Sequence, residues 1–292
     1  MFGKKKRQNR EEKLQATQQQ TKTIERKVPV LTLISYIDQG RRKYQQDAVY
    51  ISTNEKILAS NRVTRAMASV CDGMGGMADG GLASATAIEM LAAGFDKIER
   101  QSSVNIPNFF MAAIQNIDKK ISTLSKENGK GSGTTMVSVI AEDNKLYWAS
   151  VGDSRIYILR GTQLQQVTRD HNYMMRLTEM VNSGQMTIQE AQAKKQKEAL
   201  ISFLGIGDVS LMDINQTPFE MQFGDIVLLC SDGVTKTLTD EQIKKILLDP
   251  TQEMERKAEM LVEAATHRNT HSQDNTSVAI LQYRERPLSS RR

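Results

Sequence analysis

The sequence has few cysteines and no long apolar run, and each shortage excludes a class of protein. Cys71 and Cys230 are the only cysteines in 292 residues. Two are too few for a disulfide scaffold, so a reducing cytoplasmic environment is the natural interpretation. No stretch of about 18 apolar residues could cross a membrane as a helix. No apolar segment of the kind found in secretory signals follows the basic N-terminus. The composition, 39% hydrophobic and 25% charged, is typical of a globular protein.

Acidic residues are few relative to basic residues at the two ends of the chain, and only there. Residues 1–28 hold nine Lys or Arg and three Glu, and residues 284–292 hold four Arg and one Glu, so the body between them carries a net charge of −4. This mildly acidic body argues against a nucleic-acid groove in the fold. Residues 1–28 have almost no large apolar side chains, which predicts a disordered basic tail. The tail could touch an acidic membrane surface or nucleic acid, and a solvated tail is the favoured alternative.

The hydrophobic pattern between the basic tails, over residues 29–283, predicts one domain with both strands and helices. Strands are expected at 28–37, 47–52, 67–71, 134–141, 145–151, 155–160, 163–167, 226–230 and 276–283. Helices are expected at 84–99, 107–124, 240–248 and 253–266, with Ser84 as the N-cap of the first. Two helices followed by a strand meander favour an α+β fold of sheet layers covered by helices. The polar residues 171–200 predict a helical excursion from the sheets.

Aspartates stand at the boundaries of the predicted strands, beside glycines or tight turns. Asp72 and Asp232 each end an apolar run and precede a glycine, Asp47 and Asp274 begin strands, and Asp153 lies between two strands. A buried strand aims such a side chain at a fixed point, and glycine lets the backbone approach a ligand closely. Mg²⁺ and Mn²⁺ prefer oxygen ligands, and one or two carboxylates suffice for each ion. Taken singly, each aspartate is more often a turn former, so both interpretations stay open.

Seven short motifs occur in an order that is typical of a known family. They are Arg42–Asp47, Asp72-Gly73-Met74-Gly75-Gly76, Gly133-Thr134-Thr135, Gly152-Asp153-Ser154-Arg155, Asp170-His171, Ser231-Asp232-Gly233 and Asp274-Asn275. Through them the chain resembles the metal-dependent type 2C serine/threonine protein phosphatases, and more closely their bacterial branch, over roughly residues 30–283. Within these motifs, the role of His171 is left open between the site and the fold.

The resemblance implies a fold of two stacked antiparallel β-sheets flanked by helices, with a helical flap at about 171–205 beside a metal cleft. It also implies ligands for two Mn²⁺ or Mg²⁺ ions. Asp72 is expected to bridge the two ions, and the carbonyl of Gly73 to bind one of them. Asp232 and Asp274 are expected to complete the first ion's site.

Three further residues acquire roles through the same resemblance. Asp47 is expected to act mainly through metal-bound water, and Asp153 matches a third, weaker ion site that shares Asp232. The implied reaction is hydrolysis of phosphoserine and phosphothreonine in proteins by a water or hydroxide that bridges two ions. Arg42 is the candidate guanidinium that spreads charge from the phosphate oxygens. The expected partners are phosphorylated proteins, the substrates of a cytoplasmic serine/threonine kinase.

Departures from the family pattern keep an alternative function open. Gln45-Gln46 stands where Asn and Glu are common, and the flap segment lacks a usual proline. The chain could therefore be a catalytically weak pseudophosphatase that acts as a phosphoprotein-binding regulatory module. The intact Asp72, Asp232 and Asp274 argue against this alternative. A third interpretation makes the basic tail a membrane or nucleic-acid tether, which the acidic body disfavours as the whole function.

Overall fold

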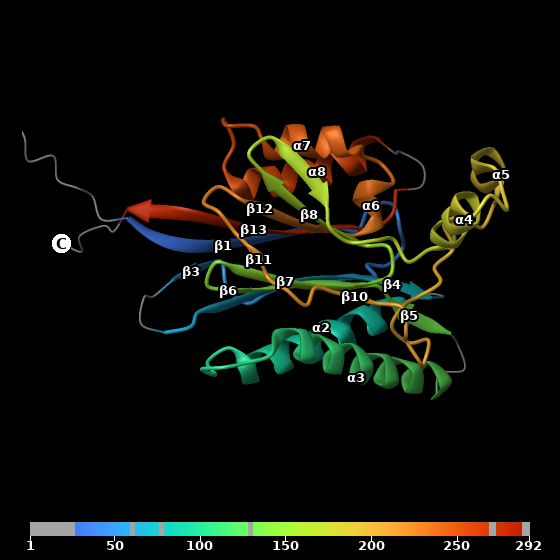
Figure 1. Cartoon of the computed structure of the whole chain (residues 1–292), viewed down its shortest axis with the longest axis horizontal. Coiled ribbons are helices and arrows are strands. Elements are labelled where there is room, and N and C mark those ends of the chain that lie inside the picture. The colour runs from blue at the N-terminus through green and yellow to red at the C-terminus, as the bar shows by residue number, and fades with distance from the viewer. Residues whose placement is uncertain (1–26, 59–61, 76–78, 128–130, 269–272, 288–292) are drawn as a thin grey trace, which may run out of the picture.

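The computed structural model describes residues 27–58, 62–75, 79–127, 131–268 and 273–287. Two antiparallel sheets lie face to face, and helices cover both outer faces (Figure 1). This arrangement confirms the predicted α+β architecture. Most of the tail predicted at 1–28, and residues 288–292, lie outside the described residues. The second tail was predicted to begin at 284, but residues 284–287 continue the last strand.

The first sheet has six strands and joins the two ends of the described chain. Its order is β3 (Glu55–Ile57), β1 (Lys27–Asp38), β13 (Thr276–Pro287), β12 (Ile226–Cys230), β8 (Arg155–Arg160) and β9 (Gln163–Gln166). Strands β1 and β13 pair along their whole length, from Lys27 opposite Pro287 to Asp38 opposite Thr276. Because this pairing is long and central, it fixes where Asp274, just before β13, enters the sandwich edge.

The second sheet is built around a strand that is buried on both faces. Its order is β10 (Asp213–Ile214), β7 (Lys145–Val151), β6 (Met136–Glu142), β4 (Arg65–Gly75) and β2 (Asp47–Ile51), with β11 (Phe219–Glu220) on β7 and β5 (Ser132–Thr134) on β4. Successive side chains of a strand point to opposite faces. In β4, Ala68 and Val70 therefore join the core between the sheets, and Met67 and Cys71 join the core under the helices.

Two pairs of helices cover the sandwich, and a third pair projects from its edge (Figure 1). They are α2 (Asp79–Ile98) and α3 (Ile106–Glu127), α7 (Asp240–Leu247) and α8 (Met254–Arg268), and the projecting α4 (Tyr173–Asn182) and α5 (Ile188–Ala193), with the single-turn α6 (Asp232–Thr235) after β12. The prediction that Ser84 caps the first helix is wrong, because α2 begins at Asp79. The buried Ser84 hydroxyl instead donates to the carbonyl oxygen of Gln46, 2.6 Å away.

Neither cysteine has the environment of a reactive thiol. Cys71 and Cys230 are buried and free. Burial raises the pKa of the Cys71 thiol well above its ordinary value and that of Cys230 to about 12. Both therefore act as small apolar core residues at neutral pH. Among the described residues, no helix is both long enough and apolar enough to span a lipid bilayer.

Candidate active site

A cavity of about 340 Å³ opens at the sandwich edge from which α4 and α5 project. Its lining residues are Arg42, Gln46, Asp72, Gly73, Met74, Gly75, Thr135, Asp153, Glu198, Leu200, Asp232, Lys236 and Asp274. Six of the seven site residues predicted from the sequence are in this set. The seventh, Asp47, lies opposite Asp72 across the pairing of β2 with β4 and is only 6% exposed. The fold thus brings all seven predicted residues to one place.

Asp72 is held by the Gly-Thr-Thr motif at the start of the neighbouring strands. The backbone carbonyl oxygen of Asp72 accepts two hydrogen bonds, one from Thr135 N at 2.8 Å and one from the Thr134 hydroxyl at 2.9 Å. Asp72 N donates in return to Thr135 Oγ1, at 3.0 Å. The same Thr135 oxygen lies 2.7 Å from Ser154 Oγ, beside Asp153. Hydrogen bonds therefore fix the backbones that present two of the cavity's carboxylates.

Gly73 stands where no other residue fits. A Cβ atom there would lie 2.1 Å from the carbonyl oxygen of Gly80 and 2.5 Å from that of Gln46. Gly73 N donates to this same Gln46 oxygen, at 3.0 Å. The close approach of three backbone segments explains the glycine and packs the start of α2 against the end of β4, at the wall of the cavity.

Asp232 and Asp274 enter the cavity from adjoining segments of the first sheet. Asp232 begins α6 directly after β12, and a Cβ atom on Gly233 would lie 2.1 Å from the carbonyl oxygen of Asn275. Asp274 Oδ2 accepts a hydrogen bond from Arg42 Nη2, at 2.6 Å. The predicted guanidinium therefore faces the cavity from its rim, with about half of its side chain exposed.

The loop that carries Arg42 is anchored by Asn275. The Asn275 side-chain amide donates to the carbonyl oxygen of Gln39, at 2.8 Å, and its oxygen accepts from Gln46 N, at 2.9 Å. Gly40 adopts a positive φ of 61°, and a Cβ atom there would lie 2.3 Å from the Asp274 carbonyl oxygen. The Asp-Asn motif thus serves two purposes, since Asp274 faces the cavity and its neighbour fastens the loop.

His171 belongs to the scaffold that aims Asp153. Its side chain is fully buried, it does not line the cavity, and its Nδ1 accepts a hydrogen bond from Gly152 N at 3.2 Å. Arg155 forms a two-pronged ion pair with Asp170, at 2.9 and 2.7 Å. The Gly-Asp-Ser-Arg and Asp-His motifs therefore lock together and hold the turn that carries Asp153. This resolves the role of His171 in favour of the fold.

Burial and the repulsion between carboxylates both raise pKa values in the cavity, and burial is the larger cause. Burial raises the pKa of Asp47 to about 6, although the nearby Ser277 and Ser231 hydroxyls oppose the shift. Burial, followed by the charge of Asp232, raises the pKa of Asp153 to about 6. Burial and the charges of its aspartate neighbours raise the pKa of Asp72 well above its ordinary value. Like charges held this close in a buried place disfavour ionisation unless a cation balances them.

The donor set fits hard divalent cations. Asp47 Oδ1 and Asp232 Oδ1 are buried and have no hydrogen-bond partner among the described residues. Among the described residues, no three Asp, Glu, His or Cys side chains are grouped so that they could hold one ion between them, so each ion would have to rely on fewer side chains and on water. Mg²⁺ and Mn²⁺ need only one or two carboxylates each because they retain water ligands. A cavity lined with carboxylate and carbonyl oxygens matches these two ions.

The flap contributes two residues to the cavity wall. Glu198 and Leu200 line the cavity, and Leu200 bridges Asn172 at the base of the flap. The predicted helical excursion beside the cleft is confirmed as α4 and α5. Helix α5 ends at Ala193, and the basic stretch that follows it forms turns.

Sequence reasoning missed Lys236, whose ammonium forms an ion pair with Asp232 inside the cavity. The charge of Asp232 raises the pKa of Lys236, although burial opposes the shift. The available signal was the spacing, because residues four apart on a helical turn lie on one face. The run Asp232–Lys236 was recognisable only once that turn was known to be helical.

Comparisons with known proteins agree with this geometry. Residues 40–272 match the model of the family described as protein phosphatase 2C. Protein phosphatase PhpP of Streptococcus pneumoniae is 31% identical over 226 residues, which cover 77% of this chain and 89% of that protein. The S. agalactiae serine/threonine phosphatase structure superposes with a TM-score of 0.73 at 26% identity, covering 86% of this chain and 99% of that one. The catalytic domain of PstP, solved with two manganese ions, gives a TM-score of 0.68 at 28% identity, covering 88% and 99%. The chain belongs to the protein phosphatase 2C family, among bacterial serine/threonine phosphatases.

Proposed function

We propose that this chain hydrolyses phosphoserine and phosphothreonine esters in proteins with the help of two Mn²⁺ or Mg²⁺ ions. The observation that carries the proposal is the meeting of five aspartates from separate segments at one cavity whose rim holds Arg42. The proposed ligands are Asp47, Asp72, the carbonyl of Gly73, Asp232 and Asp274. The relatives named as serine/threonine phosphatases, and the PstP structure with two manganese ions, support the same function.

Each protein group has a distinct proposed role. Bound ions would acidify a water molecule and neutralise phosphoryl oxygens. Asp72, which the charges of the other aspartates surround, is proposed to bridge them, and Asp47 to bind behind it through water. Arg42 donates one hydrogen bond to Asp274, and the remaining N–H groups of its planar guanidinium can donate hydrogen bonds to two phosphoryl oxygens. The Ser231 hydroxyl, 2.8 Å from Asp47 Oδ2, orients that carboxylate.

The decisive experiment measures phosphate release from a phosphothreonine peptide with Mn²⁺, with a chelator, and with the Asp232→Asn variant. Activity is expected to need both the ion and Asp232. The matched control is Asp208→Asn, because Asp208 is exposed and lies outside the cavity lining. The control is expected to retain full activity.

The other results have defined meanings. A silent wild-type protein that still binds Mn²⁺ in calorimetry would favour the pseudophosphatase, a regulatory module that binds phosphoproteins. A protein that binds no divalent ion would leave the aspartates as turn formers and refute the metal centre. The opposing kinase, the cytoplasmic location and membrane contact by the tail remain predictions from the sequence.

A further inference from the structure

Lys236 occupies one corner of the cavity together with Asp153 and Asp232. Residue 236 directly follows α6, so its side chain lies over the same face as Asp232, four residues earlier. Its ammonium pairs with Asp232 Oδ2, and half of the side chain remains exposed. The second oxygen of Asp232 has no hydrogen-bond partner among the described residues. The lysine therefore covers one side of this carboxylate and leaves the other available.

The ammonium acts on more than its direct partner. Its positive charge interacts electrostatically with Asp153 and Asp274 as well as with Asp232. The other groups that face the cavity are Asp72, Glu198 from the flap and Arg42 from the rim. Lys236 is a cation whose charge acts on Asp153, whereas Arg42 is hydrogen-bonded to Asp274. The two fixed cations therefore have different direct partners, Asp232 for Lys236 and Asp274 for Arg42.

A formal charge count sets the number of divalent ions that the cavity can hold. Six carboxylates line or adjoin it: Asp47, Asp72, Asp153, Glu198, Asp232 and Asp274. Two fixed cations oppose them, Arg42 and Lys236, which leaves an excess of four negative charges. Two divalent ions cancel this excess. A third ion would leave an excess of positive charge and would have to sit beside an ammonium, where repulsion is strong at low effective dielectric.

We propose that Lys236 is a built-in cation for the Asp153–Asp232 corner, so that this chain binds two divalent ions and excludes a third from that corner. This inference rests on the proposed metal centre and replaces the third ion that the sequence predicted at Asp153. An ammonium is permanently present, whereas a weakly bound ion depends on its concentration. The corner therefore stays neutralised when divalent ions are scarce.

The test counts bound Mn²⁺ on the full chain, by calorimetric titration and by electron paramagnetic resonance of free Mn²⁺, without substrate. Wild-type protein is expected to bind two ions. Lys236→Met is expected to gain a third, at least about tenfold tighter than any further binding to wild type. Lys236→Arg keeps the charge and should bind two. The matched control is Lys244→Met, which removes a lysine paired with Glu241 outside the cavity.

A second pair of variants keeps the inference falsifiable if Lys236→Met folds poorly. Lys236→Gln, a second uncharged variant, should also gain a third ion. Asp153→Asn in the wild-type background should leave two ions bound, whereas Asp153→Asn added to Lys236→Gln should abolish the gained ion. Three ions on wild type, or equal counts for wild type and both uncharged variants, would overturn the role of Lys236 and leave the metal centre intact. Wild-type protein that binds no ion would refute the proposed function itself, and the inference with it.

Discussion

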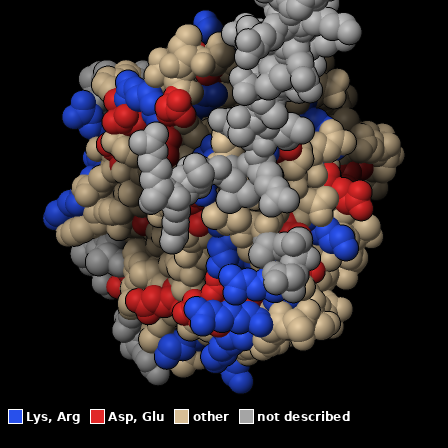
Figure 2. Space-filling model, turned by 90° about the vertical axis from the view of Figure 1, so that its left-hand side faces the viewer, with Lys and Arg blue, Asp and Glu red and all other residues tan. Residues whose placement is uncertain are grey.

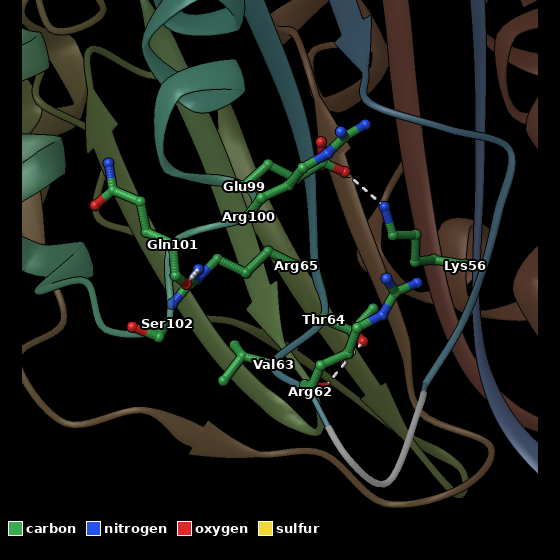
Figure 3. Close-up of a pocket in the computed structure, with 9 residues that line it drawn as sticks. All are labelled: Lys56, Arg62, Val63, Thr64, Arg65, Glu99, Arg100, Gln101 and Ser102. Atoms are coloured by element: carbon green, nitrogen blue, oxygen red, sulfur yellow. Dashed lines mark hydrogen bonds and ion pairs between the residues drawn. The ribbon is translucent and has the colours of Figure 1, made fainter.

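Two charged cavities lie at opposite ends of β4, and they balance their charges differently. Asp72 lies near one end of the strand, and Arg65, roughly 23 Å away at the strand's rise per residue, starts the other. The second cavity, of about 700 Å³, has four basic residues in its lining, Lys56, Arg62, Arg65 and Arg100, and one acidic residue, Glu99 (Figure 3). We call it the basic cavity. Its fully buried Arg65 pairs with Glu142 at 2.6 Å, and Lys56 pairs with Glu99.

The two cavities differ in whether their charged groups are paired within the protein. The charges of the basic cavity are mostly paired, whereas several carboxylates of the acidic cavity are available to a ligand. Arg65 also donates to the carbonyl oxygens of Ile98 and Gln101, at 2.9 and 2.6 Å. Figure 2 views the end of the sandwich where β3 lies and shows blue and red residues side by side on that face. In the acidic cavity the carboxylates outnumber the two cations, Arg42 and Lys236, and several keep raised pKa values or unpartnered oxygens. The charges of the basic cavity are paired largely within the fold, whereas the excess carboxylates of the acidic cavity need an external cation.

The largest effect is expected from Asp72→Asn. Loss of the carboxylate should lower phosphatase activity by about 10³-fold or more, since a bound metal contributes several kcal/mol to transition-state stabilisation. The same variant should be more stable than wild type in chelator, because a buried charge that its neighbours repel has been removed. Phosphate release and urea denaturation measure the two effects. Lower stability in chelator would show that the acidic cavity is already balanced.

The next effect is a pH dependence confined to the acidic cavity. The pKa values of Asp47 and Asp153 rise from 3.8 to about 6 on folding. Between these values the folded chain binds more protons than the unfolded chain, so the free energy of unfolding in chelator should fall as pH rises from 4 to 7. The rise at Asp153 alone corresponds to about 3 kcal/mol. If Mn²⁺ binds the folded, ionised cavity as proposed, it should reverse the decline.

Urea denaturation across this pH range, with chelator and with Mn²⁺, tests the dependence. A flat profile in chelator would contradict the raised pKa values. A decline that Mn²⁺ leaves unchanged would place the responsible groups outside the proposed metal centre.

Arg65→Met should destabilise the protein at the basic cavity and leave ion binding at the acidic cavity unchanged. Removing one partner of a buried ion pair typically destabilises a protein by about 3 kcal/mol or more, because the other charge is left unpaired. Adding Glu142→Met should recover part of the loss, since it removes the stranded carboxylate. Denaturation midpoints measure both changes, and Mn²⁺ titration of the folded variant should match wild type. Weaker ion binding would reveal that the two ends of β4 are coupled.

The sequence predicted most strands and helices because alternation and helical period record which face is buried. It placed the end of β4 too early, at Cys71, although the strand runs to Gly75. The run Asp72–Gly75 looks like a turn, and its pairing with β5 is a long-range contact that no local pattern contains. The metal ligands could be proposed because each stands at a strand boundary within a recognisable motif.

The residues that sequence reasoning missed depend on tertiary placement. Lys236 has no motif, and only the single turn of α6 brings it back to Asp232. Glu198 reaches the cavity through the fold of the flap, which departs from the family pattern. Arg65 was hidden for a different reason: it is the first residue of an apolar strand and looks like an exposed boundary residue until its pairing with Glu142 on the neighbouring strand is known.

The smallest effect is expected from Lys56→Met, at the open rim of the basic cavity. Lys56 pairs with Glu99 at 2.5 Å, but 30% of the lysine side chain and 22% of the glutamate remain exposed. Solvent-exposed pairs typically contribute about 0–1 kcal/mol, so the denaturation midpoint should move little, and less still at high salt. A loss above about 2 kcal/mol would mean that this pair acts as a buried one. The basic cavity would then depend on the Lys56–Glu99 pair at its rim as well as on buried Arg65.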